Sequence, residues 1–199
     1  MNINNLSFQD IVEYLQRYFP VTEEQAEMMM GYCEMRHFDK KVVIVDEGEV
    51  DTYLNMVMKG LVRKFVRKGK NEITLQLATE GHIIDSDISF LKQEPSLVVV
   101  ETIEPTTLVS LSRKKMDEAL EKMPGADRMG RQLLLAMFLK KDERHYKLLQ
   151  HTTRERFVEY VHNHPHMLQR VPQKYLASYL NIKPETFSRL KHLVRKSKP

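Results

Sequence analysis

Residues 81–101, GHIIDSDISFLKQEPSLVVVE, bring together side chains that can bind a small polar molecule. Two acids, Asp85 and Asp87, follow a glycine, and Pro95 separates them from an apolar run. Carboxylate and hydroxyl oxygens in a glycine-bounded loop can hydrogen-bond a ligand, and a short apolar run bounded by a proline is typical of a buried strand. The stretch therefore predicts a loop that holds a small molecule, whose identity the residues alone leave open.

Other residues with chemical potential carry weaker signals. His162, His164 and His166 alternate across an expected helix end without a nearby Cys or carboxylate, so we expect solvated loop histidines rather than metal ligands. The single cysteine, Cys33, excludes an internal disulfide and a multi-cysteine metal site within one chain, and we expect it to be buried. The sequence contains no nucleophile elbow, Walker loop or HExxH motif. We therefore expect no enzymatic activity, no cofactor and no metal.

Composition limits the class of protein and its compartment. With 42% hydrophobic and 29% charged residues, the chain of 199 residues can bury a core and is not expected to be disordered. No apolar run approaches the roughly 20 residues that span a bilayer. The N-terminal segment lacks the basic start and apolar stretch of a signal peptide. We therefore expect a cytoplasmic protein without a membrane segment.

Charge is distributed unevenly along the chain. Residues 151–199 carry ten Lys and Arg and three Glu, a net charge of +7, whereas residues 1–150 carry 21 basic and 24 acidic residues, a net charge of −3. A mildly acidic body with a basic C-terminal segment suggests that this segment binds a polyanion. A solvated basic surface explains the charge alone equally well.

The spacing of apolar residues changes twice along the chain. Residues 6–19 have helical spacing, and Thr22 can cap a second short helix. Between residues 38 and 112, β-branched runs recur about every 8 to 12 residues, which is typical of an antiparallel sandwich or barrel. Helical spacing returns after Ser112, which can cap a helix that ends at Pro124. The pattern predicts an α+β protein with a central β block.

Residues 127–150 form a longer expected helix without a proline. Its first half is strongly apolar, and its second half is charged. A helix that is apolar on more than one side must be covered by another element. Heptad spacing is imperfect because Lys141 and His145 fall in the expected seam, so packing on the β block and pairing with a second copy both remain open.

The last fifty residues predict a helix-turn-helix. In RVPQKYLASYLNIKPETFSRLKHLVRK, Pro172 suits the first turn of a helix, and a break at Asn181 and Ile182 separates it from a second, basic helix. The alternative is a plain helical hairpin whose charges are solvated. In a helix-turn-helix the early residues of the second helix reach base edges and later ones contact phosphates. The expected DNA-binding residues are Lys174, Lys183, Glu185, Thr186, Ser188, Arg189, Lys191 and Arg195.

This order of elements resembles the Crp/Fnr family of bacterial transcription regulators. The resemblance covers roughly residues 6–195 and rests on GEVDTYLNMVMKGLVRKFV, similar to the glycine and aromatic spacing of the family's β-roll, and on YLASYLNIKPETFSRLKHL. In the second segment, Glu185, Thr186 and Arg189 stand where the family's recognition helix typically has Glu, Thr or Ser, and Arg.

The resemblance implies a fold and a set of partners. The implied parts are a sensor domain with an antiparallel β-roll (a double-stranded β-helix) in residues 1–124, a dimerisation helix in residues 125–150 and a winged-helix-like helix-turn-helix in residues 151–199. The resemblance also implies a homodimer on two-fold symmetric DNA and contact with RNA polymerase, which favours dimerisation as the role of the long helix. The chain stops at Pro199, so we expect the wing to be truncated.

The resemblance also gives residues 81–101 a meaning. Where cyclic-nucleotide-binding relatives hold the ribose and phosphate with Gly-Glu and Arg-Ser or Arg-Thr pairs, this sequence has Ser86-Asp87 and Leu97-Val98. Without a cation at Leu97 a buried phosphate would lose roughly 1.5–3 kcal/mol. Lys92 compensates only in another loop register, so cyclic AMP is not expected to bind. The expected effector pocket is formed by Ile84, Ser86, Asp87, Ile88, Ser96, Leu97 and Val98.

Two functions of different classes follow. The first is a homodimeric, sequence-specific DNA-binding transcription regulator that responds to an unidentified effector or to none. The second is a small-molecule-binding regulatory protein that acts through protein contacts without binding DNA. The basic charge of residues 151–199 favours the first.

Overall fold

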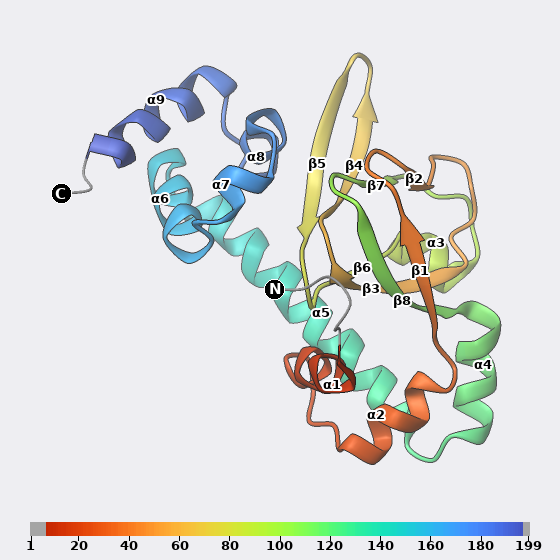
Figure 1. Cartoon of the computed structure of the whole chain (residues 1–199). Helices are drawn as coiled ribbons and strands as arrows, with labels where there is room; N and C mark the ends of the chain where they lie inside the picture. Colours follow the sequence, from red (N-terminus) through yellow and green to blue (C-terminus); the bar gives the residue numbers. More distant parts are fainter. Residues whose placement is uncertain (1–6, 197–199) are drawn as a thin grey trace. The chain divides into compact units, whose positions relative to one another are not determined.

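A computed structural model describes residues 7–196 of the chain, with side chains described for residues 7–191. The chain divides into two compact units (Figure 1). The first unit combines Met1–Lys64 with Leu77–Leu139, and the second combines Phe65–Gln76 with Lys140–Pro199. The middle of the chain therefore contributes to both units, because the end of one β-hairpin belongs with the C-terminal helices.

Two short helices open the described chain, and each begins at a capping box. α1 (Phe8–Gln16) begins after Ser7, whose side chain accepts from the backbone of Asp10. α2 (Glu23–Met30) begins after Thr22, which is paired in the same way with Gln25. These reciprocal side-chain bonds satisfy backbone N–H groups that the first helical turn leaves without partners. Both predicted helices are confirmed, and α1 ends earlier than residue 19.

Eight strands form two four-stranded sheets, and every pairing with a described register is antiparallel. Sheet A has the order β1 (Glu34–Phe38), β8 (Thr106–Ser112), β3 (Tyr53–Lys59), β6 (Ile83–Ile84). Sheet B has the order β2 (Val43–Val45), β7 (Val99–Thr102), β4 (Val62–Lys68), β5 (Asn71–Ala78). The predicted α+β class with an antiparallel β-roll is confirmed.

Sheet A separates two apolar clusters because successive side chains on a strand point to opposite faces. Val57 of β3 and Leu108 of β8 belong to a cluster that also includes residues of sheet B, such as Val62 and Val100. Their neighbours Met56 and Val109 belong to a second cluster with residues of α1 and α2. The sheet is therefore buried on both faces, by the roll interior on one side and by helices on the other.

Two elements were not recognised from their residue types. β1 begins at Glu34, before the predicted β block at residue 38, because most of its side chains are polar or exposed and do not form an apolar run. A short helix, α3 (Asp87–Lys92), lies within residues 81–101 and ends at Gln93 in a left-handed conformation (φ 57°). The loop predicted to hold a small molecule therefore contains a helix.

α4 (Arg113–Lys122) and α5 (Ala126–Gln150) follow the β-roll. Ser112 caps α4 by accepting from the backbone of Lys115, as its position in the sequence predicts. The first part of α5 lies beside α1 and α2 (Figure 1). It buries Met129, and Leu133 and Met137 pack against the same cluster as α1 and α2. Core packing therefore applies to one face of the long helix.

Four helices make up the C-terminal part of the second unit: α6 (Thr153–Asn163), α7 (Met167–Arg170), α8 (Gln173–Tyr179) and α9 (Pro184–Lys196). The predicted break between the last two helices is confirmed. No helix among residues 7–196 is long and apolar enough to cross a membrane.

Gly60, which joins β3 to β4, provides a test of the fold. Its φ is +104°, and an added Cβ would lie 2.6 Å from the carbonyl oxygen of Pro105. Gly69 also has a positive φ, +61°, but an added Cβ there would meet no atom within 4 Å. We expect Gly69→Ala to lower the free energy of unfolding by about 1 kcal/mol and Gly60→Ala by about 3 kcal/mol or more. Urea denaturation of both variants measures the difference, and equal losses would contradict the observed close approach.

Candidate functional site

The segment between β6 and β7 is held by a buried carboxylate on the neighbouring loop. Asp51 is 1% exposed, accepts from the backbone N–H of Ser86 at 2.7 Å and accepts from that of Tyr53 at 3.0 Å. Its own N–H donates to Ser89 Oγ at 2.8 Å. Burial raises the pKa of Asp51, and the two N–H donors act in the opposite direction. Asp51 therefore fixes the start of α3 from outside that helix.

The serine hydroxyls in this segment are bonded within the segment itself. Ser96 Oγ lies 2.8 Å from Ser86 Oγ and 2.7 Å from the carbonyl oxygen of Val98. Ser89 Oγ donates to the carbonyl of Glu94 at 2.5 Å. Ser86, Ser89 and Ser96 are all at most 3% exposed. A ligand that needs these hydroxyls would first have to break these internal hydrogen bonds.

A buried lysine also contacts this segment. Lys64 of β4 places Nζ 2.6 Å from Asp87 Oδ2 and donates to the carbonyl of Asp85 at 2.9 Å. The side chain of Lys64 is 6% exposed, and that of Asp87 is 24% exposed. The carboxylate that begins α3 is therefore neutralised by a lysine of the same chain. We call Asp51, Lys64, Ser86, Asp87, Ser89 and Ser96 the cassette.

The second unit contains a tightly joined pair of helices, α8 and α9. Leu176 and Ala177 on α8 are each 1% exposed, and Ile182 donates its N–H to the carbonyl of Ala177 at 2.9 Å. Asn181 in the turn has a φ of +53°, a conformation that Asn tolerates better than most residues. The small side chain of Ala177 and this turn allow the two helices to cross closely.

Helix α6 packs against the pair formed by α8 and α9. Phe157 and Phe187 stack edge to face with ring centroids 5.0 Å apart, which joins α6 to α9. Arg156 donates to the carbonyls of Leu180 at 3.0 Å and Asn181 at 3.2 Å. These hydrogen bonds give partners to backbone carbonyls at the end of α8 and in the turn. α6 therefore holds the pair through these contacts, while Glu185 and Arg189 of α9 stay exposed.

The end of the β4–β5 hairpin also contacts α8 within the second unit. The backbone N–H of Thr74 donates to Ser178 Oγ at 2.9 Å, and Ser178 Oγ lies 3.3 Å from the carbonyl oxygen of Glu72. Ser178 thus links α8 to a strand that begins in the same unit.

Comparisons with known proteins agree with this geometry. Residues 35–123 match the family model described as the cyclic nucleotide-binding domain. The global regulator CLP of Xanthomonas campestris superposes with a TM-score of 0.69 at 15% identity, covering 88% of this chain and 92% of that chain. The catabolite activator protein of Thermus thermophilus gives 0.56 at 21% identity, covering 90% and 86%. FixK2 of Bradyrhizobium japonicum gives 0.65 at 20% identity, covering 82% and 85%. No curated protein matched by sequence.

The chain has the Crp/Fnr regulator fold. The similarity of fold extends beyond the cyclic nucleotide-binding domain, because the superpositions on CLP and on the catabolite activator protein cover 88% and 90% of this chain.

Against the Crp/Fnr pattern, the residues expected to form the effector pocket fall into two groups. Ile84 is buried in the roll interior, and Ser86, Asp87, Ser96 and the partly buried Val98 lie in or beside the cassette. The other two side chains are exposed, Ile88 at 57% and Leu97 at 70%.

Sequence reasoning missed Lys64 as the cassette's cation. Lys92, considered as a replacement for the Crp/Fnr arginine, is exposed on α3, whereas Lys64 comes from a different strand. The signal that could have found it is the pair Arg63-Lys64 between the apolar residues Val62 and Phe65 of β4. Adjacent strand residues face opposite sides, and both are buried, Arg63 opposite Glu101 at 2.7 Å and Lys64 opposite Asp87.

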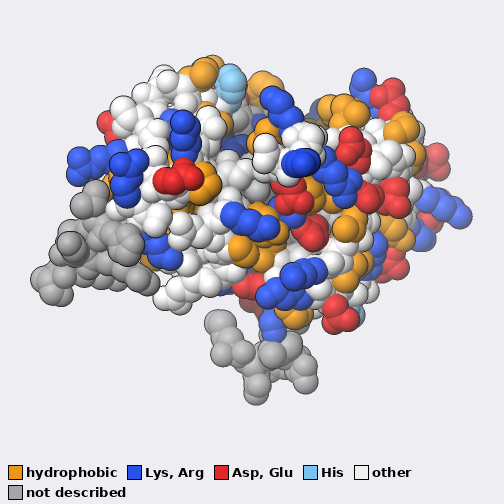
Figure 2. Space-filling model, turned by 90° about the horizontal axis from the view of Figure 1, so that it is seen from above, with side chains coloured by type: hydrophobic (Ala, Val, Ile, Leu, Met, Phe, Trp, Pro, Cys, Tyr) orange, Lys and Arg blue, Asp and Glu red, His pale blue; other side chains and the backbone are white. Residues whose placement is uncertain are grey.

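Of the expected DNA-binding residues, Lys174 lies on α8, Lys183 lies in the turn just before α9, and the others lie on α9. Glu185 and Arg189 are exposed and four positions apart, so they share one face of α9. Where the C-terminal helices lie, at the left of Figure 2, blue Lys and Arg side chains predominate. Lys174 and Lys183 are exposed, Thr186, Ser188 and Lys191 are partly buried, and the side chain of Arg195 lies outside the described residues.

The three histidines at the end of α6 do not form a metal site. His164 stacks on Tyr160 with ring centroids 4.9 Å apart, and burial lowers its pKa. Within residues 7–191, no group of three or more His, Cys, Asp or Glu is arranged to hold a metal ion.

The Lys64–Asp87 pair can be tested by its effect on stability. Asp87→Asn leaves the Lys64 ammonium buried without its carboxylate, so we expect the free energy of unfolding to fall by about 2 kcal/mol. The double variant Lys64→Met/Asp87→Asn removes that charge and should recover part of the loss. Asp117→Asn, which breaks the exposed pair with Arg113, is the matched control and should cost less than about 1 kcal/mol. A loss at Asp87 no larger than at Asp117 would show that the pair contributes nothing.

Proposed function

We propose that the chain is a cytoplasmic, homodimeric, sequence-specific DNA-binding transcription regulator of the Crp/Fnr type that cyclic AMP does not control. The observation that carries the proposal is the exposed face of α9 on a helix pair that α6 supports, in the basic part of the chain. The functional division we propose is a sensor domain in residues 1–124, a dimerisation helix in residues 125–150 and a DNA-binding domain in residues 151–199.

The exposed face of α9 gives each side chain a role in the proposed complex. Lys183, Glu185, Thr186, Ser188 and Arg189 stand near the N-terminal end of α9, the part of a recognition helix that enters the major groove. Arg189 can bond a guanine edge with two donors. Lys174, Lys191 and Arg195 would instead neutralise phosphates, which contributes affinity without sequence preference.

The outer side of α5 supports the proposed homodimer. Four of its exposed apolar residues are three, eight and three positions apart, which places them on one face of a helix: Leu135 at 58%, Phe138 at 62%, Tyr146 at 54% and Leu149 at 72% exposure. Large apolar side chains at this spacing are typical of a helix that pairs with another helix. A two-fold axis between two such helices would present two recognition helices to a symmetric operator, with RNA polymerase as a further partner.

The closed cassette supports the exclusion of cyclic AMP. The hydroxyls of Ser86 and Ser96 are bonded to each other, and that of Ser89 donates to the carbonyl of Glu94. The lysine of the cassette is bonded to Asp87, and Asp51 adds a buried carboxylate. A cyclic phosphate would have to displace Asp87 from Lys64 and lie near two acids. CLP is described as c-di-GMP responsive.

DNA binding can be tested first without knowing the operator. Binding of random duplex DNA, followed by fluorescence anisotropy over a range of salt concentrations, should give a steep negative slope of log affinity against log salt. We expect Lys191→Ala to flatten the slope by about 1. Lys40→Ala, an exposed lysine of the β-roll, is the control and should leave the slope unchanged.

Selection of sequences from a random duplex library then tests specificity. The wild-type protein should enrich a two-fold symmetric site, and Arg189→Ala should weaken binding to it by about 1–3 kcal/mol while relaxing the preference at one position of each half-site. Absence of salt-sensitive DNA binding by the dimer, with or without cell extract, would overturn the proposal and favour a regulator that acts through protein contacts.

Calorimetry with cyclic AMP and cyclic GMP tests the cassette. Because the hydroxyls and the lysine are already bonded within the chain, we expect no measurable heat of binding at ligand concentrations up to about 100 μM. A Kd of about 100 μM corresponds to a binding free energy of about −5.5 kcal/mol, so we expect binding weaker than this. 5′-AMP is the control for weak, nonspecific binding of a nucleotide. Micromolar binding of either cyclic nucleotide, absent with 5′-AMP, would show that the cassette opens and that the exclusion is wrong.

A further inference from the structure

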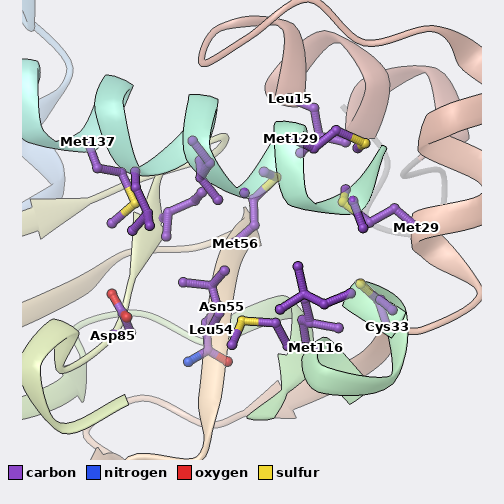
Figure 3. Close-up of a pocket in the computed structure, with 18 of the residues that line it drawn as sticks. Leu15, Met29, Cys33, Leu54, Asn55, Met56, Asp85, Met116, Met129 and Met137 are labelled. Atoms are coloured by element: carbon purple, nitrogen blue, oxygen red, sulfur yellow. The ribbon is translucent and has the colours of Figure 1, made fainter. Parts of the chain in front are cut away.

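A cavity of about 410 Å³ lies in the first unit on the helical side of sheet A. Figure 3 shows it between α5, which carries Met129 and Met137, the N-terminal helices with Leu15 and Met29, and the strand that carries Leu54 and Met56. Every lining residue belongs to the first unit. The volume falls within the range of pockets that bind small molecules, roughly 300–1,000 Å³.

The lining is apolar and rich in methionine. Seven methionines contribute to it: Met29, Met30, Met56, Met116, Met123, Met129 and Met137. Methionine is flexible and polarisable, so a cavity built from it adapts to apolar molecules of irregular shape. Cys33 also lines the cavity, and burial raises its pKa to about 11, so its thiol is neutral at physiological pH.

The cavity is separate from the cassette's hydroxyls and from the interior of the roll. Met56, Ile83 and Val109 line the cavity, whereas their strand neighbours Val57 and Ile84 point into the roll interior. Sheet A therefore stands between the two spaces. The cavity meets the cassette at Asp87, which lines it together with Asp85.

A glycine near the start of α5 lines the cavity. Gly130 lines the cavity together with Leu133 and Met137, which lie three and seven positions further along and so share its face of the helix. A Cβ added at Gly130 would meet no atom within 4 Å. Glycine inside a helix costs about 1 kcal/mol relative to alanine, and here neither a positive φ nor a close backbone contact accounts for it.

We propose that this cavity binds an uncharged, largely hydrocarbon small molecule. A carboxylate or phosphate lacks a partner inside, because Arg131 at the rim is 71% exposed and paired with Asp127 at 2.8 Å, and Asp85 adds a carboxylate to the lining. A strongly cationic ligand would lose its hydration against an almost wholly apolar wall. An apolar ligand instead gains from the area it buries against the methionines.

The uncharged fluorescent probe N-phenyl-1-naphthylamine tests the proposal on the full chain, without DNA. We expect saturable binding of one probe per chain, with a blue-shifted emission, and a rise in Tm with probe concentration. Gly130→Met places a flexible side chain in the cavity and should weaken binding about ten-fold or more, a change of 1.4 kcal/mol or more. Gly130→Ala, which favours the helix, should fold at least as stably and bind with an intermediate affinity.

Arg128→Met is the matched control, since it adds the same side chain to an exposed position of α5 outside the cavity lining. It should bind the probe like the wild type. Equal binding by Gly130→Met and Arg128→Met, in variants shown to be folded by circular dichroism, would overturn the proposal. Loss of probe binding as the protein concentration rises through dimer formation would also overturn it, because the cavity would then be filled by the second copy. None of these results depends on whether the chain binds DNA.

Discussion

The burial of sheet A on both faces is the constraint on which the first unit depends. Val57 and Leu108 fill the roll interior, while Met56 and Val109 on the opposite face require helices to cover them. α1, α2 and the start of α5 supply that cover. A shift of one residue in the register would exchange the two sets of side chains. The strand pairing therefore determines which side chains fill the roll interior and which contact the helices and line the cavity.

The Lys64–Asp87 pair gives the cassette a different character from an open anion site. A buried ammonium must be paired, and the nearest carboxylate is the one that begins α3. The pair therefore fixes α3 against β4. Because Asp87 already pairs with the Lys64 ammonium, an anionic ligand would have to displace Asp87 to bind that lysine. The cassette therefore holds α3 in place through contacts within the chain.

Local signals predicted most elements from the sequence, because caps, glycine turns and apolar spacing each act within a few residues. Ser112 and Thr22 cap the helices expected of them, whereas β1 was missed because Glu34, Arg36 and His37 give it no apolar pattern. Long-range pairings were not predictable in the same way. Lys64 is 23 positions from Asp87 in the chain, and only the strand order brings them together. The cavity likewise arises from the packing of several elements, which no single segment encodes.

For the long helix α5, the sequence left open whether it packs on the β block or pairs with a second copy. Gly130, Leu133 and Met137 face the cavity and the helical cluster, whereas Leu135 and Phe138 stand exposed on another side. Packing on the β-roll and pairing with a second copy therefore use different faces, and neither excludes the other. A molecule in the proposed cavity would contact the first face of a helix whose second face holds the proposed dimer. If the molecule binds the monomer and the dimer with different affinities, thermodynamic linkage requires that its binding change the free energy of dimerisation by the same amount.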